Sequence, residues 1–172
     1  MRRFFLNIFI LVSTFICAQQ PVYENELKIK GGVGTLIPHR SIMQHLHTGR
    51  ANSFEISYNF NTYGENPFHS IYNYPQLGIA AGIYNLGNQE DIGLTYAFTP
   101  TISVPFSMNK HLPQLKLGIG LGIVSKPFGT NGNFRNIAIG SHLNAAILLE
   151  LEKSFQLFEK IKMYYSVSAI HF

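Results

Sequence analysis

The fold is decided by the stretch Leu115-Lys-Leu-Gly-Ile-Gly-Leu-Gly-Ile-Val124. Aliphatic side chains alternate here with Lys116 and three glycines. Successive side chains of a β-strand point to opposite faces, so this stretch predicts a strand with one face of continuous hydrocarbon and another nearly free of side chains.

The same period of two recurs along the chain, and no window gives a convincing helical period. Phe54, Ile56, Tyr58 and Phe60, for example, alternate with polar residues. The chain is therefore predicted to be all-β. We expect strands at 27–37, 52–61, 76–84, 91–104, 115–124, 137–152 and 157–172.

The composition indicates which solvent meets the apolar faces. Only 13% of the residues are charged, and the alternate faces carry mainly Gly, Ser, Thr and Asn. A soluble β-sandwich would carry many charges on its solvent face. The pattern instead favours an antiparallel up-and-down outer-membrane β-barrel with a narrow polar interior. The candidates for aromatic girdles at the membrane interfaces are Phe54, Tyr58, Phe60, Tyr96, Phe98, Tyr164 and Tyr165.

The N-terminus indicates export. Arg2 and Arg3 precede a mostly apolar run from Phe4 to Cys17, which predicts a signal peptide over 1–18 and a mature barrel domain over 19–172. A lipoprotein anchored through Cys17 is the disfavoured alternative, because bulky residues precede it. Loss of the signal leaves 11 basic against 9 acidic residues, a net charge of +2 that gives no support for nucleic-acid binding.

The strand count is odd. Single-chain bacterial barrels have an even number of strands, with eight as the smallest usual size. The stretch 62–75 is too long for a tight turn and too aromatic for a plain loop. We therefore expect either a hidden strand within 62–75 or an eighth strand beyond Phe172, which makes the barrel incomplete at its C-terminus.

The final strand carries a histidine on its apolar side. Met163, Tyr165, Val167, Ala169 and His171 share one face, and Lys162, Tyr164, Ser166 and Ser168 share the other. A histidine directed at hydrocarbon is costly unless it has a partner or a function. His171 is thus a candidate functional residue, and the alternative is a polar ring that lies at the headgroup level near a girdle.

Two stretches carry a resemblance to a known family: Asn136-Ile-Ala-Ile-Gly-Ser-His-Leu-Asn144 and Met163-Tyr-Tyr-Ser-Val-Ser-Ala-Ile-His-Phe172. They resemble the C-terminal half of the lipid A 3-O-deacylase (acyloxyacyl hydrolase) family, an eight-stranded barrel with His-x-Ser on the outside of the last-but-one strand and an acid on the next. His171 matches the family's catalytic histidine and Phe172 the middle position, so the serine and the acid would lie beyond the chain end.

The resemblance implies an exported outer-membrane enzyme that removes a fatty acyl chain from lipid A of lipopolysaccharide. It implies neither a metal nor a diffusible cofactor, leaves a homodimer open, and makes the 172-residue chain inactive by itself. Positions two apart on a strand share a face, so His-x-Ser spacing would set an imidazole beside a hydroxyl as general base.

Alternatives remain at this stage. A non-catalytic barrel of structural or adhesion type is favoured by the aromatic C-terminal Phe172, whereas a soluble secreted β-protein is disfavoured by the low charge. His45-x-His47 is interpreted as a solvated loop rather than a metal pair, since no further ligand is near.

Faces are also predicted for two neighbouring strands, 115–124 and 137–152, which we expect to pair antiparallel. Their outward residues would be Leu117, Ile119, Leu143 and Ile147. Their inward residues would be Gly118, Gly120, His142 and Asn144, the last two in an interior polar network, and Glu150 and Glu152 are interpreted as interior or turn residues.

Overall fold

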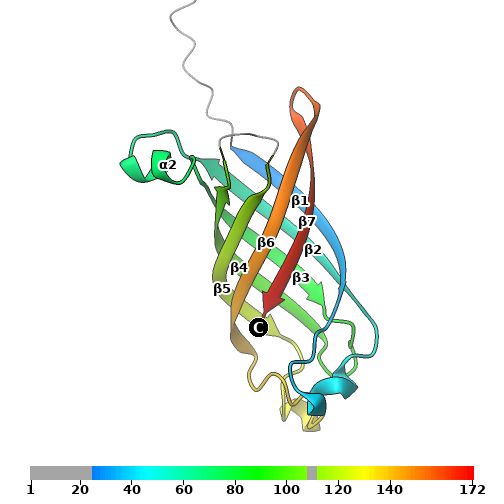
Figure 1. Cartoon of the computed structure of the whole chain (residues 1–172). Coiled ribbons are helices and arrows are strands. Elements are labelled where there is room, and N and C mark those ends of the chain that lie inside the picture. The colour runs from blue at the N-terminus through cyan, green and yellow to red at the C-terminus, as the bar shows by residue number, and fades with distance from the viewer. Residues whose placement is uncertain (1–24, 108–111) are drawn as a thin grey trace, which may run out of the picture.

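The computed structural model describes residues 25–107 and 112–172, so the predicted signal peptide over 1–18 lies outside the described residues. Seven antiparallel strands form one sheet in simple sequential order. The sheet curls into a barrel-like wall (Figure 1). Its strands are β1 (Glu26–Thr35), β2 (Arg50–Asn61), β3 (Gln76–Asn85), β4 (Leu94–Pro105), β5 (Gln114–Val124), β6 (Leu143–Phe158) and β7 (Ile161–His171). The all-β prediction and the count of seven strands are confirmed.

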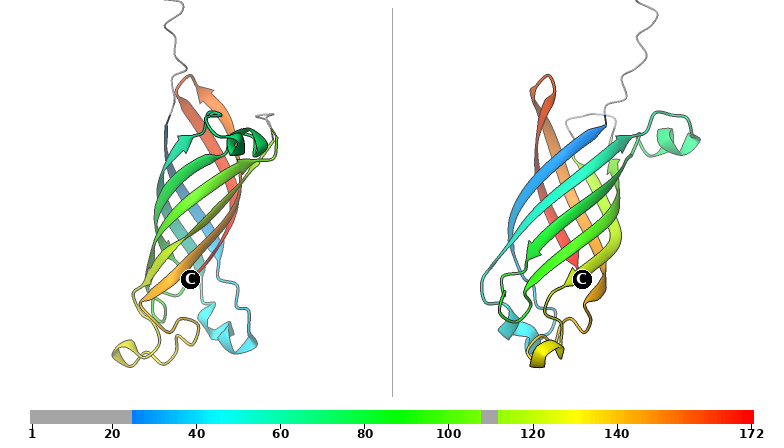
Figure 2. Two further views of the ribbon diagram at one scale, coloured as in Figure 1. Left: turned by 90° about the vertical axis from the view of Figure 1, so that its left-hand side faces the viewer. Right: turned by 180° about the vertical axis from the view of Figure 1, so that it is seen from behind.

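Three short helical turns interrupt the connections: η1 (Ser41–Leu46), α2 (Pro67–Ile71) and η2 (Thr130–Gly132). Among the described residues, no helix has the length and apolarity needed to cross a bilayer. Met43 and Leu46 of η1 pack with Ile92, Val124 and Ile139 into a small core where loops gather at one end of the sheet. Long loops and η1 and η2 lie at this end, and α2 lies at the other (Figures 1 and 2).

The predicted strand faces are confirmed for β5 and the start of β6. Leu117, Ile119, Leu143 and Ile147 are all exposed on the outside, and β5 and β6 pair antiparallel with Ile119 opposite Ile147. Gly118 is buried on the inner side. A Cβ at Gly120 would overlap the carbonyl oxygen of Phe98, so the close approach of β4 and β5 requires a glycine there.

Several boundaries and faces differ from expectation. Residues 62–75 contain α2 and no strand, so the hidden-strand alternative is wrong. β6 begins at Leu143, later than predicted, which leaves His142 exposed in the preceding loop. His142 Nδ1 lies 2.9 Å from the Val124 carbonyl oxygen, and Asn144 bonds to Ser141 rather than joining an interior network.

At its other end β6 runs further than predicted. Gln156 pairs with Lys162, and Lys153 with Tyr165, so residues interpreted as a turn continue the ladder to Phe158. Lys153, Ser154 and Gln156 give this extension the composition of a turn, although Phe155 and Leu157 continue the alternation of the strand.

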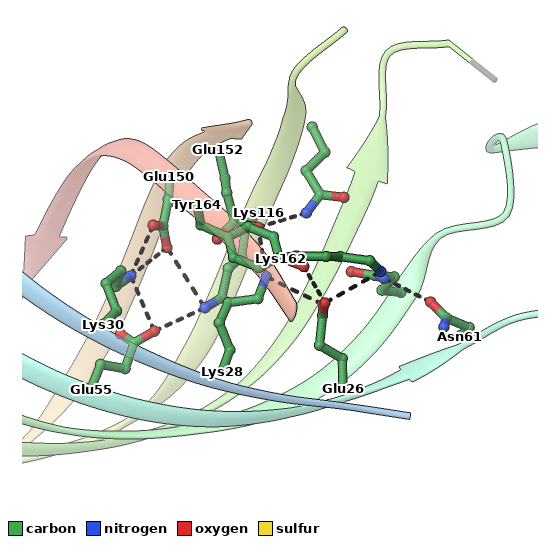
Figure 3. Close-up of polar contacts among 12 residues, drawn as sticks. Glu26, Lys28, Lys30, Glu55, Asn61, Lys116, Glu150, Glu152, Lys162 and Tyr164 are labelled. Carbon is green, nitrogen blue, oxygen red and sulfur yellow. Dashed lines mark hydrogen bonds and ion pairs between the residues drawn. The ribbon is translucent and has the colours of Figure 1, made fainter. Parts of the chain in front are cut away.

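The two edge strands are not paired to one another. β1 pairs with β2 and β7 with β6, and the described residues hold no ladder between β1 and β7. Both edges nevertheless face each other across the interior, where side chains bridge them (Figure 3). The wall is therefore curled but laterally open.

Candidate active site

His171 is exposed on the outside of β7, two residues after Ala169 on the same face. Its register partner is Ile147 of β6, which is 48% exposed. The outward orientation inferred from sequence is confirmed. In the described part of the chain, the His171 ring has no hydrogen-bond or ion-pair partner.

The surroundings of His171 on the outer face are apolar. β6 contributes Leu143, Ala145, Ile147 and Leu149 there, and β7 contributes Val167 and Ala169. Neither strand presents a serine or a carboxylate on this face, because Ser166 and Ser168 share the phase of the inward Tyr164. A general base needs a nucleophile to activate, and in the described part of the chain β6 and β7 place no serine and no carboxylate beside His171 on the outer face.

Phe172 points the other way. Its ring lies 5.6 Å from that of Tyr84 in an edge-on arrangement, and it packs with Ile170 against a small inner cluster of Tyr84, Ala97 and Ala146. This contact fixes the phase of the end of β7, so that His171 must face outward.

The interior of the wall holds a cluster of charged side chains that the sequence analysis did not identify (Figure 3). Lys30 Nζ lies 2.8 Å from both carboxylate oxygens of Glu150 and 3.1 Å from Oε1 of Glu55. Lys116 Nζ lies 2.9 Å from the same Glu55 oxygen and 3.6 Å from Glu150. Together these four residues form a closed ring of ion pairs drawn from β1, β2, β5 and β6.

A second part of the cluster lies nearer the start of β1. Lys28 Nζ donates to Glu152 Oε1 at 2.7 Å and lies 4.0 Å from the centre of the Tyr164 ring. Glu26 accepts a hydrogen bond from the Tyr164 hydroxyl and lies 3.4 Å from Lys162 Nζ. Tyr164 is thus an interior residue, and its assignment to an aromatic girdle is wrong, because its phase sets it opposite Tyr165.

The cluster is balanced in charge. Its cations are Lys28, Lys30, Lys116 and Lys162, and its anions are Glu26, Glu55, Glu150 and Glu152. Charges away from water are tolerated when they are paired and hydrogen-bonded. Glu150 and Glu152 are fully buried inside, as the sequence indicated, and so neither can orient the outward imidazole of His171.

The pairs in this cluster also span the open edge. Lys28 and Lys30 on β1 contact Glu152 and Glu150 on β6, and Glu26 on β1 contacts Tyr164 on β7. Side chains alone thus join the first strand to the last two strands. The alternation of Lys28, Lys30, Glu55 and Lys116 with apolar residues was the available sequence signal for them.

His45 and His47 contact separate partners. His45 Nε2 lies 2.8 Å from the Arg135 carbonyl oxygen, and His47 Nε2 lies 2.7 Å from Thr35 Oγ1. Over residues 25–107 and 112–172, no three His, Cys, Asp or Glu side chains are grouped as a metal site requires.

Comparison with known proteins identifies the family. The model of the lipid A 3-O-deacylase (PagL) family matches residues 52–172, from β2 to the last residue of the sequence. No curated protein and no solved structure gives a significant match. The matched region includes β7 with His171 and covers more than half of the chain. On this match, and on a curled antiparallel wall with an apolar exterior, the chain belongs to the lipid A 3-O-deacylase family.

Proposed function

We propose that this chain is the larger part of an outer-membrane lipid A acyl-ester hydrolase of the His-Ser type, exported by the signal peptide over 1–18. The observation that carries the proposal is the outward, solvent-accessible His171 on an apolar exterior, in a strand that the family model covers. Acyl esters of lipid A lie at the boundary of the bilayer, so a base on the outside of the wall meets its substrate there.

In the proposed reaction a serine hydroxyl at the position after Phe172 attacks the carbonyl carbon of the ester. His171 accepts the hydroxyl proton and returns it to the sugar oxygen as that bond breaks. The acyl-enzyme is then hydrolysed by water, which His171 deprotonates in turn. An acid on an eighth strand orients the imidazole.

The open edge supports the proposal of an eighth strand. Along the open edge, β1 and β7 each have a row of backbone N–H and C=O groups that pair with no neighbouring strand among the described residues. Such groups have no water to bond with inside a membrane, and a barrel satisfies them by closing. A strand inserted between β7 and β1 would bring the family's count to eight and set the acid near His171.

The test compares two proteins: the 172-residue chain, and the chain extended through the downstream reading frame. Fatty-acid release from lipid A is measured by mass spectrometry. We expect release from the extended protein only, and its loss in the extended His171→Ala variant by about 100-fold to 10,000-fold. His39→Ala, exposed in the connection between β1 and η1, serves as the matched histidine control and should retain activity.

Two outcomes would overturn the proposal. Substantial turnover by the 172-residue chain would place the nucleophile elsewhere. A folded, extended protein without acyl release would instead favour a non-catalytic barrel of structural or adhesion type.

A further inference from the structure

The connection between β2 and β3 is a built structure rather than a simple turn. Thr62 Oγ1 donates to the Pro75 carbonyl oxygen at 2.7 Å and closes its base. The Asn66 side chain caps α2 by accepting from the Phe68 amide at 3.0 Å. Asn73 Nδ2 donates to the carbonyl oxygen of Pro105, which ties the segment to the end of β4. These contacts hold residues 62–75 in one conformation.

Its position is unusual for a barrel of this type. Outer-membrane barrels have short turns at one end and long loops at the other. The long connections containing η1 and η2 lie at the His171 end, whereas the other two connections at the opposite end, residues 106–113 and 159–160, are shorter than 62–75. The 62–75 segment lies at this short-turn end and stands off sideways from the wall instead of covering its mouth (Figures 1 and 2).

The surface of the segment is apolar and aromatic. The rings of Phe68 and Tyr72 pack at a tilt with centres 4.6 Å apart and are 41% and 46% exposed, and Ile71 is 71% exposed. Glu65 is the sole Asp, Glu, Lys or Arg between residues 62 and 75. Exposure of such a surface to water is unfavourable, which indicates that a lipid phase or another molecule covers it.

The adjoining strands indicate that lipid covers this surface. Phe60 on β2 and Leu77 on β3 are register partners, both exposed on the outside of the wall. The aromatic segment therefore continues the apolar exterior past the ends of β2 and β3. Phe and Tyr rings are enriched where acyl chains meet headgroups, because one part of the ring is apolar and another is polar. A second copy of the chain is a poor candidate, since a stable interface buries roughly 800 Å² per partner, far more than a single helical turn offers.

We propose that residues 62–75 form an interfacial anchor that lays Phe68, Ile71 and Tyr72 into the lipid headgroup region of the leaflet opposite His171. The proposal rests on the proposed membrane-spanning function of the wall. The strand ladders between the two ends are continuous. An anchor at one rim therefore fixes the depth of the whole wall and the height at which His171 meets the other leaflet.

The absence of tryptophan from the sequence makes a direct test practical. Tyr72→Trp introduces a single reporter at the anchor, and Phe68→Trp replaces it should the first variant misfold. Ile119→Trp, in the middle of β5 and 72% exposed, is the hydrocarbon reference. Phe134→Trp, in the loop at the His171 end and 67% exposed, is the aqueous reference.

Each protein is inserted into phosphatidylcholine vesicles whose acyl chains are brominated either near the headgroup or near the bilayer centre, and folding is checked by circular dichroism. We expect several-fold stronger quenching of the anchor reporter by shallow than by deep bromines. The opposite order is expected for Ile119→Trp, and little quenching for Phe134→Trp.

The references separate the ways in which the proposal can fail. An unquenched anchor reporter together with a quenched Ile119→Trp overturns the anchor and leaves the membrane-spanning wall intact. An unquenched Ile119→Trp overturns the membrane location itself. Anchor fluorescence that changes with protein concentration, at fixed lipid, assigns the surface to a second copy and also overturns the anchor.

Discussion

Removal of Lys116 should reveal how much of the wall's stability depends on its interior charges. The Lys116 side chain is 1% exposed, and its ammonium contacts Glu55 at 2.9 Å and Glu150 at 3.6 Å. Lys116→Met keeps the length of the aliphatic chain and deletes the charge. Both carboxylates would then share Lys30, whose side chain is 19% exposed.

The expected loss of stability follows from the contacts that the two carboxylates keep in Lys116→Met. Breaking a buried ion pair by removing one partner costs about 3–5 kcal/mol, because the other charge is left without compensation. Here Lys30 still contacts both carboxylates, and the Tyr84 hydroxyl still donates to Glu55 at 3.0 Å. The lower end of the range applies, and a loss of about 3 kcal/mol corresponds to a change of about 100-fold in the unfolding equilibrium.

The assay is reversible unfolding of the detergent-folded protein in urea, followed by far-ultraviolet circular dichroism. Lys160→Met, in the exposed turn between β6 and β7, is the matched control and should leave the midpoint unchanged. Adding Glu55→Gln to Lys116→Met should recover part of the loss, because it deletes one uncompensated charge. Equal midpoints for Lys116→Met and Lys160→Met would refute the reasoning, since the cluster would then contribute nothing.

Three further outcomes are expected. The mature protein should fractionate with the outer membrane and need detergent for extraction, because its exterior is apolar; recovery as a soluble periplasmic monomer would contradict this. Gly120→Val should prevent folding in detergent, as judged by circular dichroism, since its side chain would overlap the β4 backbone at Phe98, whereas Gly140→Val, with open space around its Cβ, should fold. Tyr84→Phe should lower the unfolding free energy in urea by about 1.5–3 kcal/mol, the usual worth of a hydrogen bond to a charged group, and an unchanged value would show that Glu55 finds another donor.

The strand phases could be predicted from sequence because alternation is a local property. Leu117 and Ile119 face outward whatever their partners are, and His171 follows from Val167 and Ala169 by the same parity. Parity also sets Tyr164 with Lys162 on the inner face, so its assignment to the girdle reflected residue type and neglected phase.

The ion cluster could not be predicted in the same way. Lys28 and Glu152 are 124 residues apart, and they meet because the sheet curls until its two edges approach. Alternation assigns each residue to the inner face but gives no distance across the interior. The helical turn α2, in contrast, had a local signal in Asn66-Pro67, a capping residue followed by proline at the first helical position.

The division between inner and outer faces also constrains how the site is completed. Tyr164 of β7 enters the interior cluster, while His171 on the same strand faces outward, so the proposed catalytic base and a residue of the ion cluster lie on opposite sides of one strand. An acid on the proposed eighth strand can orient His171 only if it shares this outward phase. A slip of one residue in the pairing of that strand would exchange its faces and direct the acid inward. It would then point toward the inner cluster of Tyr84, Ala97 and Ala146 against which Phe172 packs, and the desolvation cost of an unpaired carboxylate there would oppose that register. This inner cluster would therefore favour the register that sets the acid beside His171, the proposed catalytic base.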